Sequence, residues 1–124
     1  MATGQIEHVN ITVSDADRSA ALFRDLLGWH ERWSGPSQFG GRTIHVGSDD
    51  SYLAIYTNDT AKGGYAKGAP LNHVGLSVAD LDAARQVVSA AGLKPFSEGQ
   101  YDPGPRSFYF FDWDGIEFEV VSYE

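Results

Sequence analysis

Three side chains in this sequence have the types and the placement of a catalytic metal site. His8 and His73 lie on the first predicted strand of each half of the chain, and Glu119 lies on the last. Because side chains alternate along a strand, we expect all three on the strand faces that point away from the helices. Two imidazoles and one carboxylate bind divalent metals and leave coordination positions open for a substrate. The pattern predicts a catalytic metal site, and a cavity without metal is the alternative.

An internal repeat makes the two histidines equivalent. Residues 6–17 align with residues 71–82 at a constant offset of 65, which places one histidine on the other. The same offset places Ala54 on Glu119 near the ends of the two halves. The first half therefore lacks the carboxylate that would complete a symmetric set of four ligands.

Each half shows the same order of elements. A strand with alternating polar and apolar residues comes first, a helix with apolar residues at helical spacing follows, and three more strands complete the module. We predict an α+β fold in which two βαβββ modules turn their polar strand faces toward a shared cavity. The modules should span residues 1–57 and 71–124 of one domain, with a flexible linker over 58–70. The strands after the helices are expected at 29–34, 42–47, 52–57, 93–97, 106–112 and 116–122.

Capping residues predict where the helices begin and end. Ser14, with Asp17 three residues later, has the pattern of a capping box, and Asp80 is the expected N-cap of the second helix. Gly28 and Gly92 are expected to end the two helices.

Further side chains could contact a substrate beside the metal. Tyr109 precedes Glu119 by one strand, so hairpin pairing could bring its hydroxyl near the metal as a proton donor, and His45 is a second candidate. Glu117 is expected at the rim of the cavity. Arg106 is the cation expected to meet an anionic group. The other predicted substrate contacts are polar or aromatic strand residues: Asn10, Thr12, Tyr52 and Tyr56, with Trp33 in an apolar wall.

The composition excludes several classes of partner. The 124 residues include 17 acidic and 9 basic side chains, and the net charge of −8 repels nucleic acid and anionic membranes alike. The absence of cysteine excludes disulfides, Cys-ligated metals and thiol nucleophiles. Neither a secretory signal nor an apolar run of about 18 residues is present, so a cytoplasmic protein with a small-molecule substrate is expected.

These features together resemble the vicinal oxygen chelate superfamily, which includes glyoxalase I, bleomycin-resistance proteins, extradiol dioxygenases and fosfomycin-resistance enzymes. The resemblance covers nearly the whole chain and rests on the paired modules, the two first-strand histidines and the segment 110–119. It implies a cup-shaped mixed sheet around a divalent metal such as Fe, Mn, Ni or Zn, and substrates that chelate it through adjacent oxygens. It also implies a homodimer, whose chains can exchange modules.

Ala54 separates the activities within this superfamily. A resemblance to glyoxalase I would imply a metal site that takes one carboxylate from each module. Ala54 stands where the first module would supply its carboxylate, so lactoylglutathione-lyase-like isomerisation is disfavoured. Two histidines and one glutamate resemble both the ferrous dioxygenases and the manganese-dependent fosfomycin-type thiol transferases, and Arg106 is the one well-placed cation for a phosphonate. We expect a metal-dependent enzyme for a small oxygen-chelating substrate, with dioxygenase-type chemistry preferred. A metal-free drug-binding protein of the bleomycin-resistance type is the alternative from another class.

Overall fold

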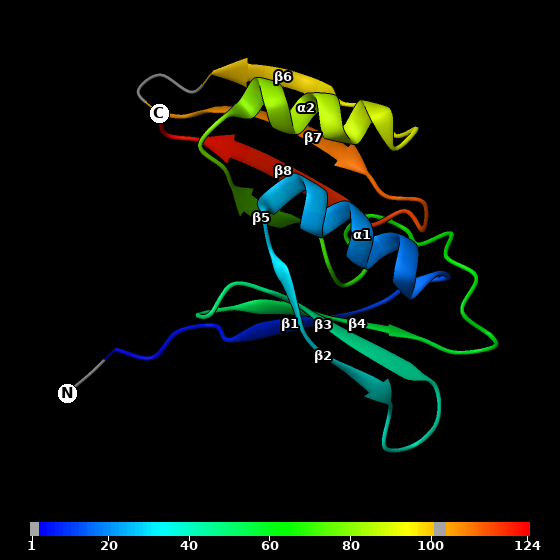
Figure 1. The fold of residues 1–124 in the computed structure, drawn as a ribbon. Helices are drawn as coiled ribbons and strands as arrows, with labels where there is room; N and C mark the ends of the chain where they lie inside the picture. Colours follow the sequence, from blue (N-terminus) through cyan, green and yellow to red (C-terminus); the bar gives the residue numbers. More distant parts are fainter. Residues whose placement is uncertain (1–2, 101–103) are drawn as a thin grey trace. The chain divides into compact units, whose positions relative to one another are not determined.

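The chain folds into two compact units of the same topology. A computed structural model describes residues 3–100 and 104–124, and the units comprise residues 1–62 and 63–124 (Figure 1). Each unit contains one helix and one mixed four-stranded sheet that does not close into a barrel. This is the predicted α+β fold of two βαβββ modules, and the division between the units falls inside the predicted linker.

The first unit begins with a parallel pair of strands at one edge of its sheet. β1 pairs in parallel with β4, and β3 and β2 follow in antiparallel order. α1 packs against β3 and β4 on one face, where Phe23, Ile44 and Ile55 are buried. The other face carries the polar positions of β1. The elements are β1 (His8–Thr12), α1 (Ala16–Leu27), β2 (His30–Pro36), β3 (Arg42–Gly47) and β4 (Tyr52–Thr57).

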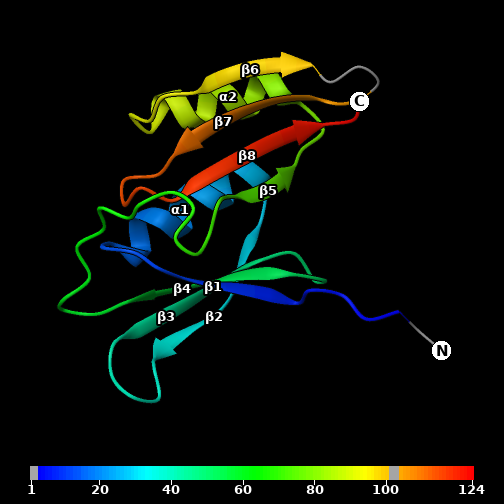
Figure 2. The same cartoon turned by 180° about the vertical axis from the view of Figure 1, so that it is seen from behind.

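The second unit repeats this arrangement, with strand order β5-β8-β7-β6 and β5 parallel to β8 (Figure 2). α2 contacts β7 and β8, and its buried Val88 lies on the same side as Phe108 and Phe118. Neither helix in the described part of the chain is long and apolar enough to cross a bilayer. The elements are β5 (Val74–Ser77), α2 (Leu81–Ala90), β6 (Phe96–Gln100), β7 (Arg106–Phe111) and β8 (Glu117–Ser122).

The helix caps correct one sequence prediction and confirm another. α1 is capped by Asp15, whose carboxylate accepts the backbone N–H of Arg18 at 3.0 Å, and not by Ser14. The hydroxyl of Ser14 instead accepts the guanidinium of Arg18 at 3.2 Å. α2 is capped as predicted by Asp80, which accepts the N–H of Ala83 at 3.0 Å. The two capping aspartates are 65 residues apart, so the repeat extends to the caps.

One strand lies later than predicted. β6 begins at Phe96 rather than near residue 93, since its first pairing with β7 joins Phe96 to Tyr109, and the register then shifts before Gly99. Ser97 takes a φ of 51° at this irregularity. The strands β3 and β4 coincide with the predicted ranges.

The turn that leads into β8 is held by a buried carboxylate. One oxygen of Asp112 accepts the backbone N–H groups of Asp114 and Ile116, each at 2.9 Å. Burial raises the pKa of Asp112, and these backbone hydrogen bonds oppose the shift. Gly115 has a φ of 93°, which suits glycine, and its Cα lies against the backbone of Tyr65. The turn therefore fixes where β8 and its two glutamates begin.

Candidate functional site

His73 and Glu119 form a close pair on the face of the second sheet that points away from α2. The Nε2 atom of His73 lies 3.2 Å from Oε1 of Glu119. The side chains are 34% and 14% exposed, respectively. The sequence predicted both residues on this face, and β8 positions the glutamate because the buried Phe118 and Val120 alternate with it.

The residue before each candidate histidine holds the other ring nitrogen. Nδ1 of His73 donates to the side-chain oxygen of Asn72 at 2.7 Å, and Nδ1 of His8 donates to Glu7 at 3.0 Å. The hydrogen bond from His8 lowers the pKa of Glu7, and the nearby charges of His8 and Arg32 act in the same direction. With a proton on Nδ1, Nε2 carries the lone pair that a metal needs.

Glu117 is buried and paired, which corrects its expected place at the rim. Its side chain is 2% exposed, and Nζ of Lys67 lies 2.7 Å from Oε2 and 3.0 Å from Oε1. Nδ1 of His73 lies 3.8 Å from the same carboxylate. Sequence reasoning missed Lys67, although a buried glutamate next to Phe118 requires a cation and the preceding linker supplies one.

Tyr109 lies beside the His73–Glu119 pair. The antiparallel register of β7 and β8 places Tyr109 opposite Glu119. Its ring meets the imidazole of His73 edge to face, with centroids 5.7 Å apart, and stacks with Phe96 at 6.0 Å. Hairpin pairing thus brings the tyrosine to the neighbourhood that the sequence predicts.

The open face of the first sheet carries stacked rings, and the Glu7 carboxylate beside them accepts the hydroxyl of Tyr52 at 3.4 Å. Tyr52 stacks with His8 at 4.9 Å and with His45 at 4.6 Å between centroids, and His45 contacts Trp33 at 5.1 Å. The guanidinium of Arg32 lies 4.4 Å from the centroid of the Tyr52 ring. Burial lowers the pKa of His45, and the positive charges of His8 and Arg32 lower it further. His45 is therefore a neutral ring at pH 7.

The remaining predicted substrate contacts share this face. Asn10 and Thr12 of β1 lie opposite Ala54 and Tyr56 of β4, which places all four on the side away from α1. The hydroxyl of Tyr56 donates to the carbonyl of Gly40 at 3.2 Å and accepts from Asn58 at 3.2 Å. This hydroxyl therefore also holds the β2–β3 turn against β4.

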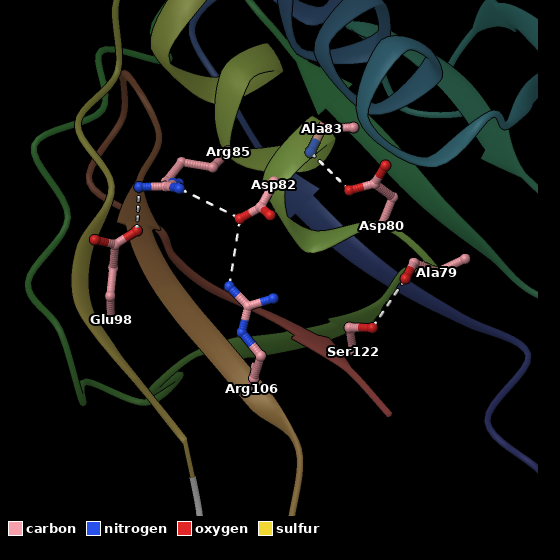
Figure 3. Close-up of polar contacts among 8 residues, drawn as sticks. All are labelled: Ala79, Asp80, Asp82, Ala83, Arg85, Glu98, Arg106 and Ser122. Carbon is pink, nitrogen blue, oxygen red and sulfur yellow. Dashed lines mark hydrogen bonds and ion pairs between the residues drawn. The ribbon is translucent and has the colours of Figure 1, made fainter. Parts of the chain in front are cut away.

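Arg106 lies on the opposite side of the second sheet, which corrects the expectation that it meets a substrate beside the metal ligands. Along β7 it alternates with Tyr109, so it shares the α2 side with Phe108 and Phe110. Figure 3 shows Asp82 of α2 between Arg85 and Arg106, each 3.3 Å from Oδ1. A cavity of about 370 Å³ beside these residues is lined by both signs of charge. The network connects α2 with β7 and, through Arg85 and Glu98 at 2.9 Å, with β6.

The three predicted metal ligands are divided between the units. His73 and Glu119 belong to the second unit, and His8 belongs to the first. Within residues 3–100 and 104–124, no group of three or more His, Asp or Glu side chains is gathered closely enough to hold a metal. The imidazole nitrogen and the carboxylate oxygen of the close pair are donors that fit Fe, Mn, Ni or Zn.

Comparisons with known proteins identify the family. A family model described as Glyoxalase/Bleomycin resistance protein/Dioxygenase superfamily matches residues 5–120. Among solved structures, a glyoxylase/bleomycin resistance protein/dioxygenase domain from Frankia sp. EAN1pec is 22% identical over 98% of both chains, with a TM-score of 0.82. The protein SMU.1112c is 24% identical over 97% of this chain and 99% of its own, with a TM-score of 0.74.

A third similar structure contains a metal. It is a variant of the fosfomycin resistance protein FosX from Listeria monocytogenes, complexed with Mn(II) and 1S,2S-dihydroxypropylphosphonic acid. It is 19% identical over 98% of this chain and 90% of its own, with a TM-score of 0.71. A search of curated protein sequences finds no match. At these identities the structural likeness shows a shared fold, whereas the family model covers nearly the whole chain, which therefore belongs to the Glyoxalase/Bleomycin resistance protein/Dioxygenase superfamily.

Proposed function

We propose that this protein is a divalent-metal-dependent enzyme that acts on a small organic substrate through two adjacent oxygens. The observation that carries the proposal is the His73–Glu119 pair, with 3.2 Å between Nε2 and Oε1. Asn72 holds Nδ1 of His73 at 2.7 Å, so Nε2 is the ring nitrogen directed at the carboxylate. Neutral imidazole and carboxylate are the donors that catalytic metal sites use.

His8 is the proposed third ligand. Its Nδ1 is held by Glu7 as that of His73 is held by Asn72, which leaves Nε2 available in the same way. When bound, a divalent metal would act as a Lewis acid that lowers the pKa of the substrate oxygens. Tyr109 would exchange a proton at its hydroxyl, because the β7–β8 register places it opposite Glu119. Substrate would be oriented by residues on the open face of the first sheet: Asn10, Thr12, Tyr52 and Tyr56.

Dioxygenase-type chemistry is our preferred reaction class. Arg106, the cation that we expected to bind a phosphonate, lies on the α2 side of its sheet and contacts Asp82. A lactoylglutathione-lyase-like isomerase would take one carboxylate from each module, and Ala54 supplies none from the first. Fosfomycin-type thiol transfer is the second candidate, because two histidines and one glutamate also fit a manganese-dependent fosfomycin-type site, and the fosfomycin resistance protein FosX shares this fold.

Metal binding tests the proposal directly. Protein purified without chelators would be analysed for metal content, then stripped and titrated calorimetrically with Mn²⁺, Zn²⁺, Ni²⁺ and, without oxygen, Fe²⁺. We expect near-stoichiometric binding, and a loss of affinity of about 100-fold or more in His8→Gln, His73→Gln and Glu119→Gln.

Two exposed residues provide matched controls. His30 pairs with Asp49 at 3.8 Å on the first unit, and Glu98 pairs with Arg85 on the second. His30→Gln and Glu98→Gln should bind metal like the parent. If the parent chain takes up no metal, or if Glu119→Gln binds metal with unchanged affinity, the proposed enzyme is contradicted. The alternative of a metal-free small-molecule binding protein would then be preferred.

We also propose a homodimer, and mixing variants would show how its ligands are shared. If His8 of one copy joins Glu119 of another, a mixed dimer of His8→Gln and Glu119→Gln chains contains one intact ligand set. If each site uses a single chain, neither set is intact. Sedimentation would establish the dimer, and metal content of the mixture would separate the two arrangements.

A further inference from the structure

The first unit has a row of aromatic rings that spans its whole sheet. Trp33 of β2, His45 of β3, Tyr52 of β4 and His8 of β1 contact one another in sequence, one ring from each strand. We call these four residues the ring row. Because every ring is attached to a paired strand, the sheet holds the row in place, as a binding surface for a rigid ligand requires.

The outer end of the row is open and specifically positioned. Trp33 is 48% exposed. A Cβ atom added to Gly35 would lie 2.8 Å from Cζ2 of the Trp33 ring, so the indole lies directly against a position that has no side chain. An exposed indole fixed over a glycine presents an apolar face that a flat ligand can cover.

The row also carries a cation. Arg32 holds its guanidinium 4.4 Å from the centroid of the Tyr52 ring and donates one hydrogen bond to the carbonyl of Ser48 at 3.2 Å. A guanidinium has five N–H donors, and its planar fork matches a carboxylate. The Glu7 carboxylate lies near this guanidinium and accepts the Tyr52 hydroxyl at 3.4 Å, so a bound anion would share Arg32 with Glu7.

We propose that the ring row binds a flat aromatic anion, with its ring stacked on the exposed indole of Trp33 and its anionic group at Arg32. The ring of His45 is inclined by 55° to that indole, so it borders the bound ring and does not stack on it. Stacking requires a π face, and Arg32 requires a negative charge, so the site selects ligands that have both. As the substrate class of the enzyme, this inference rests on the proposed function, since His8 is both the last ring of the row and a proposed metal ligand. Binding by the row itself does not require the metal.

Three probes of similar size separate the two requirements. Metal-stripped protein would be titrated calorimetrically with 2-naphthoate, with neutral 2-naphthamide, and with decahydro-2-naphthoate, which keeps the charge but is not flat. We expect 2-naphthoate to bind, and each of the other two to bind about tenfold more weakly, as loss of one ring or ion contact implies. Equal affinity for all three, or no binding of 2-naphthoate, would overturn the proposal.

Substitutions locate the binding on the row. Trp33→Leu should weaken both naphthalene probes about tenfold, whereas Arg32→Gln should weaken 2-naphthoate and leave 2-naphthamide unchanged. Gly35→Ala, which displaces the indole and keeps every ring, should weaken both. Phe39→Leu is the control, because Phe39 is a 93% exposed aromatic residue of the same unit outside the row. Thermal unfolding would establish that each variant is folded, and a folded Trp33→Leu with parental affinity contradicts the assignment.

The Glu119→Gln variant separates this proposal from the proposed function. Its second unit lacks the metal-binding carboxylate, and its first unit is unchanged. If the parent protein binds no metal but Glu119→Gln binds 2-naphthoate as tightly as the parent, the ring row is a ligand site and the proposed enzyme is contradicted. Metal binding by the parent without 2-naphthoate binding would retain the enzyme and eliminate this substrate class.

Discussion

The two units place a histidine at equivalent points of their sheets, His8 as the first residue of β1 and His73 directly before β5, and surround it with different side chains. At the offset of 65, Tyr52 and Ala54 of β4 correspond to Glu117 and Glu119 of β8. His8 consequently stacks on Tyr52, and its Nδ1 lies 3.0 Å from Glu7, the residue before it. His73 instead has Nε2 at 3.2 Å from Glu119, a carboxylate supplied by the last strand. The repeat therefore sets the backbone and the orientation of the imidazole, and the last strand of each unit sets its chemistry.

This difference assigns separate tasks to the two open faces. The second sheet offers charged oxygens, and the cation that balances the buried Glu117 comes from Lys67. The first sheet offers π faces, a neutral His45 and the guanidinium of Arg32. A duplicated module can keep one half for holding a metal and adapt the other for recognising a substrate.

Giving the first unit the carboxylate of the second should produce the largest effect. Ala54 is 2% exposed, so Ala54→Glu would bury a charge that has no cation of its own. We expect the free energy of unfolding to fall by about 3 kcal/mol, measured by urea denaturation in the presence of a chelator.

The register partner of Ala54 is the matched control. Asn10 is exposed and lies opposite it on β1, so Asn10→Glu should change stability by less than about 0.5 kcal/mol. An Ala54→Glu protein as stable as the parent would mean that the two open faces differ less than their side chains indicate.

Removing the cation of the second unit should have the next largest effect. Lys67→Met leaves the buried carboxylate of Glu117 without its partner at 2.7 Å. Because Lys67 is itself about half exposed, we expect a loss of about 2 kcal/mol, below the cost of breaking a fully buried pair. Urea denaturation of Lys67→Met, Glu117→Gln and the double variant would give the coupling between them.

Lys62→Met is the control for this prediction, since Lys62 is an exposed lysine just before the second unit. If both lysine variants cost the same, the pair does not stabilise the unit. If the double variant is no more stable than Lys67→Met, an unpaired charge on Glu117 is not what destabilises the single variant.

The sequence is sufficient to predict the order of the elements and the strand face that carries His73 and Glu119, because periodicity and the repeat offset are local or internal to the chain. The same alternation of side chains places Arg106 away from this face. Arg106 and Tyr109 are three residues apart on one strand, so they cannot both face the site. Asp15 is a similar case, because the offset from Asp80 points to it directly.

Other features depend on how distant segments meet. The partner of Glu117 is set by the path of the linker that carries Lys67, 50 residues earlier in the chain. The ring row requires the register of four strands and a bulge between Glu31 and Trp33. Strand pattern fixes the face of a residue, but it does not fix which ring of a neighbouring strand it contacts.

The helix caps test the part of the comparison in which the units are alike. Asp15→Ala and Asp80→Ala each remove one carboxylate that accepts a backbone N–H at 3.0 Å, so each should cost about 1 kcal/mol. Ser14→Ala should cost less than about 0.5 kcal/mol, because Ser14 is not the cap. If urea denaturation shows equal losses of unfolding free energy for Ser14→Ala and Asp15→Ala, the assignment of Asp15 as the cap is contradicted in favour of the predicted capping box at Ser14.

The smallest expected effect is a pH dependence of stability that comes from His45 of the first unit. Burial, with the positive charges of His8 and Arg32, lowers the pKa of His45 in the folded protein, so the unfolded chain binds its proton at a higher pH. As pH falls through the ordinary value of 6.5, protonation favours the unfolded chain and stability decreases; below the folded pKa the decrease ends. The second unit has Tyr109 opposite Glu119 where the first has His45 opposite Ala54, so His45 has no histidine counterpart on β7. His45→Phe should therefore flatten the decline of the urea midpoint between about pH 7.5 and pH 5, while the exposed His30→Gln should not. Parallel profiles for the parent and His45→Phe would mean that the ring of His45 is as accessible to protons as it is in the unfolded chain.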